Sequence, residues 1–406
     1  MGRMARMAIA AVVMLSFLVS ACASNQAAVP TEIPIGAVVP LTGKYASGGT
    51  QLKAGYELAV DDINKAGGVF VKQFNKKLPF KLTVLDDESN PSETVDRLET
   101  LYSSDKVMAY LGGFGSDLHA AGAPIGDKNK VPYLGIAFAL HSIHEKGLKY
   151  LFSPYPKSPD IAKETFALLN TLPKETRPKK LAIFQEATDW GIEQEALWKK
   201  EAAANGYEIA VDEKYAPGTK DYSPMIMKAK DAGVEGVLAL PNPPDGMAMM
   251  KQIRELGLNA KFYLLVRAPD GITWGKDMGQ AGNYVVGAAL MYFDNLKYPG
   301  VQEAAARFKA KYGRPMDPIA GPAYGLVQIL ADAISRADKY DRTSIRDAIA
   351  KTDMTTIAGP VSFRPDGTGR VELQFYQWID GKQVLIWPKS QAEKSLVYPA
   401  PAWNKR

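Results

Sequence analysis

The sequence predicts an α/β fold in which two doubly wound parallel-sheet lobes are joined by a hinge of several strands. Two observations predict it. Short apolar segments alternate with amphipathic segments from residue 32 onward, and the same alternation starts again after about residue 153. Repeated strand–helix–strand units place parallel strands in one sheet with helices on both faces. The 406 residues are enough for two or three domains.

In the first part of the chain, strands and helices follow one another closely. The apolar segments that predict strands are residues 33–41, 80–85, 107–111 and 131–136. Between them, residues 51–66 carry apolar side chains at helical spacing. A second helix is predicted to begin at Asn90-Pro91, where a capping residue precedes a proline, and a third helix to span residues 117–129.

The second part repeats the pattern. Strands are predicted at residues 180–185, 234–240 and 262–266, and helices at residues 192–205 and 246–256. Two later helices, at residues 301–312 and 320–337, are expected to return to the first lobe. Three final strands are expected to close the sheets, at residues 359–363, 371–378 and 384–387.

These elements predict where the chain divides. Lobe 1 is expected to contain residues 32–152 and 291–360. Lobe 2 is expected to contain residues 153–290 and 361–390, followed by a C-terminal tail at residues 391–406.

The amino terminus has the pattern of an exported lipoprotein. Arg3 and Arg6 precede an apolar run at residues 7–19, which is shorter than a membrane span of about 20 residues but typical of a secretory signal. The run ends in Val-Ser-Ala-Cys, which resembles the bacterial lipobox and makes Cys22 the predicted lipidation site. Residues 1–21 are then a signal peptide and residues 22–31 a tether. The alternative is an ordinary signal peptide with a chance cysteine.

Composition excludes several other classes. Cys22 is the single cysteine, so no internal disulfide, CxxC pair or cysteine metal cluster can form. Without Arg3 and Arg6 the formal charge falls from +5 to +3, and the remaining charges are scattered, which argues against nucleic-acid binding. No later stretch approaches 18 apolar residues, so we expect a protein that is anchored to a membrane and does not cross it.

The predicted fold places a binding site between the lobes. Open parallel sheets bind ligands beyond the carboxyl ends of their strands, where helix N-termini favour anions. Two such lobes on either side of a hinge form a cleft that can close.

Several segments resemble, in order, the branched-chain amino-acid binding proteins of ABC transporters. They are IGAVVPLTG (35–43), GYELAVDDIN (55–64), the DD and NP pairs of 86–91, GGFGS (112–116), TDWG (188–191) and GTKDYS (218–223). The resemblance runs from about residue 33 to residue 380. It implies a type I periplasmic fold, an amino acid or related small organic acid as ligand and ABC permease subunits as partners. It also implies an extracytoplasmic location, and neither enzymatic activity nor a cofactor.

The resemblance also implies ligand-binding residues. The carboxylate-binding serine of the family corresponds to Ser116, whose alternative role is to cap its helix. An Ala-x-Thr segment corresponds to Ala137-Phe138-Ala139, in which Ala139 lacks the hydroxyl. A stacking tyrosine corresponds to Trp190, which would otherwise pack between the lobes.

The departures from the family predict a different ligand. Two tyrosines are replaced by Gly48 and Asn242, which should widen the pocket. The acidic residue that receives the ligand's ammonium group falls on Val266 or on Arg267. If Arg267 faces the cleft, it would repel an ammonium and bind a second carboxylate; the alternative is a solvated surface arginine. Asp270 could still bind an ammonium, although Asp-Gly more often forms a turn.

We therefore expect the ligand to be a bulkier or amino-free carboxylate. An aromatic or dicarboxylic acid is favoured over leucine, isoleucine or valine. The alternative function is a ligand-sensing receptor domain that signals to a membrane partner.

Enzymatic function is not expected. The sequence has no GxSxG elbow and no glycine-rich GK[ST] loop. His141 and His144 are not part of an HExxH helix, so we expect no metal site and place both in a surface loop. His119 follows Ser116 by three residues and is a candidate pocket residue.

Overall fold

The first sheet is parallel and orders its strands β4-β1-β5-β6-β7 in the computed structural model, which describes residues 29–406. Its strands are β1 (Ile33–Val39), β4 (Phe80–Asp86), β5 (Tyr110–Leu111), β6 (Tyr133–Leu134) and β7 (Leu151–Phe152). The predicted strands at 33–41 and 80–85 are thus confirmed, whereas the other two are shorter than predicted. A small hairpin, β2 (Val69–Val71) and β3 (Lys76–Leu78), lies between β1 and β4 in the sequence.

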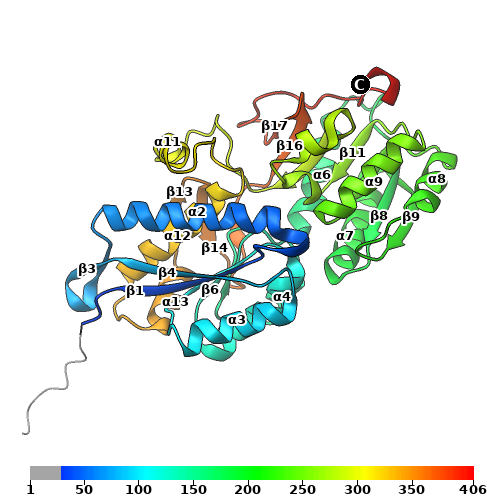
Figure 1. Cartoon of the computed structure of the whole chain (residues 1–406). Coiled ribbons are helices and arrows are strands. Elements are labelled where there is room, and N and C mark those ends of the chain that lie inside the picture. Colours follow the sequence, from blue (N-terminus) through cyan, green and yellow to red (C-terminus); the bar gives the residue numbers. More distant parts are fainter. Residues whose placement is uncertain (1–28) are drawn as a thin grey trace, which may run out of the picture. The chain divides into compact units, whose positions relative to one another are not determined.

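Helices cover both faces of this sheet. Figure 1 shows α2 (Ala46–Lys65) on one face and α3 (Pro91–Ser103) and α4 (Ser116–Asn129) on the other. Asn90 caps α3 as predicted, since its side-chain oxygen accepts a hydrogen bond from the Ser92 amide at 2.9 Å. A 3-10 turn, η2 (Gly43–Tyr45), connects β1 to α2.

Later segments return to α2. The helices are α11 (Val301–Tyr312), α12 (Ala320–Arg336) and α13 (Arg342–Ala350), followed by a sheet of β13 (Asp353–Thr356), β14 (Gly359–Phe363) and β15 (Gly369–Arg370). A side chain at Gly55 would meet the Ala320 carbonyl oxygen at 2.3 Å, so this glycine allows α12 to lie directly on α2. Arg307 of α11 pairs with Asp62 of α2 at 2.8 Å.

The second sheet has seven strands in the order β17-β16-β12-β11-β10-β8-β9. They are β8 (Lys180–Glu186), β9 (Glu208–Tyr215), β10 (Gly236–Ala239), β11 (Phe262–Leu265), β12 (Val285–Ala289), β16 (Gln374–Ile379) and β17 (Lys382–Trp387). Strands β8 to β12 pair in parallel, which confirms the predicted parallel sheet, although the sequence does not predict β9 and β12 themselves. Strands β16 and β17 are antiparallel, because Asp380 and Gly381, both with positive φ, form a two-residue hairpin turn.

Helices also pair on the second sheet. α6 (Ser158–Asn170) packs against α7 (Asp189–Asn205), and α8 (Ser223–Asp231) packs against α9 (Pro243–Glu255). The short helices α5 (Ser142–Glu145) and α10 (Trp274–Met278) lie in connecting segments.

The chain passes between the two sheets three times. Residues 153–157 lead from β7 to α6, residues 290–300 from β12 to α11, and residues 371–373 from β15 to β16. The first crossover pairs with the segment before the third, because the Ser153 amide donates to Gly367 O at 2.9 Å and the Gly369 amide to Ser153 O at 2.8 Å. These segments form the predicted hinge of several strands.

Residues 32–406 form one compact unit. The limits given above for the two lobes stay a prediction. The signal peptide, Cys22 and most of the tether fall outside the described residues. Within residues 29–406, no helix has the length and apolar character needed to span a bilayer.

Candidate ligand-binding site

Six of the sequence-predicted site residues line one cavity at the carboxyl ends of strands from both sheets. The space between its lining residues measures about 320 Å³, part of which is open to solvent. Ser116 and residues 137–139 come from the side of the first sheet, and Trp190 and Arg267 from the side of the second. A second cavity measures about 340 Å³, again including space open to solvent, and shares Ser116, Trp190 and Arg267 as lining residues. Open α/β sheets bind ligands in this region.

Ser116 is the first residue of α4. The helix cap is Gly115, whose φ of 113° requires glycine, and whose Cβ would lie 2.8 Å from the Tyr45 ring if it had one. Ser116 therefore does not cap its helix. Its side-chain oxygen accepts a hydrogen bond from the Leu140 amide at 3.3 Å, which leaves the hydroxyl hydrogen free to donate to a ligand in the cavity.

The segment 137–139 directs its carbonyl groups into the protein. The carbonyl of Ala137 accepts from the Gly115 amide at 3.1 Å, and that of Ala139 from the Ser158 amide at 2.8 Å. The carbonyl of Phe138 accepts from the Lys157 ammonium at 2.9 Å. The amides of Phe138 and Ala139 have no acceptor among residues 29–406. Because the peptide O and H point in opposite directions, these amides can bind an anion in the cavity.

Ala137 and Arg267 hold strained backbone conformations. Ala137 has a φ of 52° and Arg267 a φ of 79°, in regions that residues with side chains rarely adopt. Such strain is concentrated at binding and catalytic sites, where the surrounding structure maintains it. Both residues line the cavity.

Arg267 is buried in an ion pair. Its side chain is 6% exposed and that of Glu186 is 2% exposed, with 2.7 Å between Nη2 and Oε2. Nη2 also donates to Leu240 O at 2.9 Å, and Nη1 donates to the Tyr45 hydroxyl at 3.1 Å. Burial opposes the charged form, but the carboxylate of Glu186 holds the pKa of Arg267 above its ordinary value. The alternative of a solvated surface arginine is therefore wrong.

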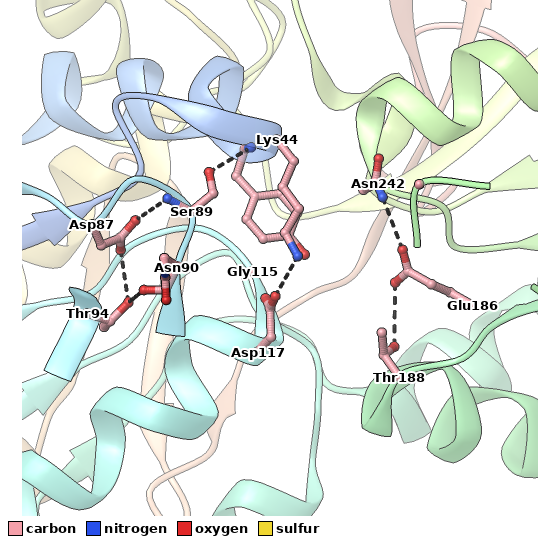
Figure 2. A network of polar contacts seen from close by, with 12 residues as sticks. Lys44, Asp87, Ser89, Asn90, Thr94, Gly115, Asp117, Glu186, Thr188 and Asn242 are labelled. Atoms are coloured by element: carbon pink, nitrogen blue, oxygen red, sulfur yellow. Dashed lines mark hydrogen bonds and ion pairs between the residues drawn. The ribbon is translucent and has the colours of Figure 1, made fainter. Parts of the chain in front are cut away.

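Asn242 does not line either cavity. It caps α9 by accepting from the Asp245 amide at 3.0 Å, and its side-chain amide donates to Asp245 at 2.7 Å and to Glu186 at 3.4 Å. Figure 2 shows that it lies beside Glu186, which Thr188 contacts from the other side. The expectation that Asn242 widens the pocket is corrected, because its side chain lies outside both cavities. It binds Glu186, the ion-pair partner of Arg267, instead.

Gly48 does not line the cavities either. A Cβ at this position of α2 would lie 2.4 Å from the Phe114 ring, so that ring already occupies the space a larger residue would take. Phe114 itself lines the cavity, and Tyr45 of η2 lines the second one. Gly48 therefore opens no space beside the Phe114 ring, and the size of the pocket relative to the family stays a prediction.

Trp190 lies in the first turn of α7 and is 5% exposed. Thr188 caps this helix by accepting from the Gly191 amide at 3.1 Å. The Trp190 ring lies 5.0 Å from the Arg267 guanidinium carbon, a cation–π contact. Trp190 thus forms a wall of both cavities and packs on the ion pair at the same time.

Asp270 places a carboxyl group at the cavity. It is buried and accepts a hydrogen bond from the Tyr376 hydroxyl at 2.5 Å. Burial raises the pKa of Asp270 to about 7, against the opposite effects of Tyr376 and Arg267. Val266 also lines the cavity but carries no charge. Asp270, which the sequence suggested as a binder of an ammonium group, is therefore the acidic residue in the lining of the first cavity.

The histidines lie outside the cavity lining. His119 is fully buried, with Nδ1 2.7 Å from Gly115 O, and burial lowers its pKa to about 3. His144 is buried as well, with Nδ1 2.9 Å from Asp366 O, so the expected surface position is wrong for this residue. No group of three His, Cys, Asp or Glu side chains within residues 29–406 is arranged to hold a metal ion.

Sequence comparison identifies relatives along almost the whole chain. Residues 32–383 match the family described as periplasmic binding protein. The Leu/Ile/Val-binding protein homolog 7 of Brucella abortus is 23% identical over 406 residues, which cover 95% of this chain and 99% of that protein.

Solved structures share the fold. The branched-chain amino acid transporter substrate binding protein LivJ from Streptococcus pneumoniae, in complex with isoleucine, has a TM-score of 0.76 and 21% identity, covering 91% of this chain and 100% of that chain. A solute binding protein of an ABC transporter from R. palustris, in complex with benzoate, has a TM-score of 0.74 and 19% identity, covering 91% and 98%. The chain therefore belongs to the periplasmic binding protein family and has the type I fold of branched-chain amino-acid binding proteins.

Proposed function

We propose that the chain is a lipid-anchored, extracytoplasmic solute-binding protein of an ABC transporter, and that it captures a small carboxylate in the cavity lined by Ser116 and residues 137–139. Membership of the periplasmic binding protein family supports the binding role and the extracytoplasmic location. The sequence before Cys22 supports export and lipid anchoring. The permease subunits of the transporter are the partners that receive the ligand.

One observation carries the choice of a carboxylate. The Ser116 hydroxyl and the unpartnered amides of Phe138 and Ala139 meet at the N-terminus of α4. Hydrogen bonds from such groups to an ionised oxygen are shorter and stronger than neutral ones, and the helix dipole adds to them.

Capture proceeds by closure of the two sides of the site. The Tyr45 hydroxyl and Arg267 meet across it at 3.1 Å. Glu193 of α7 accepts from the amides of His141 and Ser142 at 2.7 and 2.8 Å. A ligand that touches both sides only when they are together favours the closed state by its difference in affinity for the two states.

The walls favour an aromatic acid over leucine, isoleucine or valine. Four rings line the cavity, those of Phe114, Phe138, Tyr155 and Trp190. Aromatic pairs add about 0.5–1.5 kcal/mol beyond the burial of their area. A dicarboxylic acid is less well supported, because its second carboxylate would compete with Glu186 for Arg267. The benzoate complex of a protein with the same fold agrees with this preference.

A thermal-shift screen of the chain from residue 23 tests the ligand class. Benzoate and other aromatic acids are expected to raise the melting temperature, because a ligand that binds the native state stabilises it by mass action. Benzamide is the matched control, since it keeps the ring and lacks the charge. A shift with leucine, isoleucine or valine and none with aromatic acids would contradict the proposed ligand.

The pH dependence of benzoate binding tests the state of Asp270. A charged Asp270 repels an amino-free acid, so we expect the affinity to fall as the pH rises through the Asp270 pKa of about 7. Asp270→Asn should remove this dependence. An amino acid ligand needs the charged carboxylate and would show the reverse, with weaker binding below about pH 7 and loss of binding in Asp270→Asn. Isothermal titration calorimetry between about pH 6 and 8 distinguishes the two, with the exposed Asp338→Asn as control.

A further inference from the structure

We infer that Lys157 is a positioning residue for the ligand's carboxylate, acting through the Phe138–Ala139 peptide, and that the ligand supplies the counter-charge this buried ammonium lacks. This role rests on the proposed function, in which the ligand carries a carboxylate. Lys157 places a positive charge behind the peptide that binds this carboxylate.

Lys157 is buried without an acidic partner. The residue is 2% exposed, and its ammonium donates to Phe138 O at 2.9 Å and to Ser153 Oγ at 2.7 Å. The ammonium also lies 3.3 Å from the centre of the Phe138 ring. No carboxylate of residues 29–406 forms an ion pair with it.

The charged groups around Lys157 do not neutralise it. Asp160 accepts from the backbone amide of Lys157 at 2.9 Å, and Glu193 and Asp366 act only through space. The two nearby imidazoles, those of His119 and His144, are held neutral by burial, which lowers the pKa of each to about 3. An unpaired buried charge is costly, and burial lowers the pKa of Lys157 well below its ordinary value. A bound anion would oppose both effects.

The peptide geometry connects Lys157 to the cavity. Phe138 O and the Ala139 N–H belong to one planar trans peptide and point in opposite directions. Because Phe138 O faces Lys157, the Ala139 N–H faces away from it. The Ala139 amide has no protein acceptor, and Ala139 lines the cavity. The ammonium on the carbonyl side polarises the peptide and strengthens its N–H as a donor.

Lys157 also connects this peptide to the hinge. Its second acceptor, Ser153, is the residue of the first crossover that pairs with Gly367 and Gly369. The next residue, Ser158, holds the Ala139 carbonyl through its amide at 2.8 Å and its hydroxyl at 3.0 Å. The start of α6 therefore fixes the ligand-facing peptides relative to the crossover.

Binding of benzoate and of benzamide to Lys157→Met tests the inference. Methionine keeps the length of the side chain and removes its charge. We expect the affinity for benzoate to fall by about tenfold or more, the affinity for benzamide to stay the same, and the melting temperature of the unliganded protein not to fall. The last result follows because removing an unpaired buried charge removes the cost of keeping it from water, and this gain opposes the loss of the hydrogen bonds to Phe138 O and Ser153 Oγ. Lys163→Met, on the exposed side of the same helix, controls for net charge.

The outcomes separate this inference from the proposed function. If Lys157→Met binds benzoate as well as the wild type does, Lys157 has no such role, and the carboxylate site stands without it. If Lys157→Met loses benzoate and benzamide equally, or melts well below the wild type, its role is structural and the inference is overturned. If the wild type binds neither benzoate nor L-leucine, the proposed carboxylate function fails and the inference fails with it.

Discussion

Replacing Glu186 by glutamine is expected to lower the free energy of unfolding by about 3–5 kcal/mol. The side chains of Glu186 and Arg267 are 2% and 6% exposed, so the substitution leaves a guanidinium buried without a counter-charge. Arg267 cannot turn toward water without breaking its bonds to Leu240 O and to the Tyr45 hydroxyl. Urea denaturation of the unliganded protein measures the loss.

Two further variants make this result specific. Asp338→Asn breaks an ion pair in which the aspartate is 94% exposed, and should change the stability by no more than about 1 kcal/mol. Combining Glu186→Gln with Arg267→Met removes both charges and should recover much of the loss. A loss in Glu186→Gln no larger than in Asp338→Asn would show that water reaches the Glu186–Arg267 pair.

The fold could be predicted where apolar periodicity is strong. The predicted helix at 301–312 and the strand at 359–363 coincide with α11 and β14. Strand β9 was not predicted, because it lies at the edge of its sheet and its exposed positions carry Glu208 and Asp212. Strand β12 was not predicted either, since VVGAA contains small residues that give little apolar signal on their own.

The site could be predicted only in part. Ser116 and residues 137–139 follow strands of the first sheet. Open sheets bind ligands beyond the carboxyl ends of their strands, so this rule and the family resemblance indicate the same residues. The sequence alone does not reveal the Arg267–Glu186 pair, because 81 residues separate its members. A signal was nevertheless present. Glu186 ends β8, and Arg267 follows β11 by two residues. These strands flank β10, and opposite charges at the ends of nearby strands suggest an ion pair.

A compensating side chain explains why Gly48 does not line the pocket. The absence of a side chain at Gly48 suggested extra space, but Phe114, 66 positions further along the chain, fills it. Tyr45 supplies a ring from the same loop region three residues earlier. A residue-by-residue transfer from a family shows which side chain is missing at one position, and not which side chain from elsewhere takes its place.

Ser116→Ala is expected to weaken benzoate binding by about 1.5–3 kcal/mol, the range for a hydrogen bond to a charged group. The hydroxyl already accepts from the Leu140 amide at 3.3 Å, so its own hydrogen is available for the ligand. Calorimetric titration measures the change, with Ser103→Ala as a control, because Ser103 bonds only within α3. Ser116→Thr should retain most of the affinity, and an unchanged dissociation constant in Ser116→Ala would exclude the proposed role.

The double variant that combines Ser116→Ala with Lys157→Met tests whether the two residues act on the same carboxylate. Changes that act on distant, independent sites add, whereas changes that act on one shared group do not. Ser116 and the Phe138–Ala139 peptide line the same cavity from neighbouring connections of the first sheet. If both stabilise one carboxylate, the double variant should lose less affinity than the two single losses combined, because a poorly held carboxylate gains less from either remaining group. Full additivity would place their effects on different parts of the ligand.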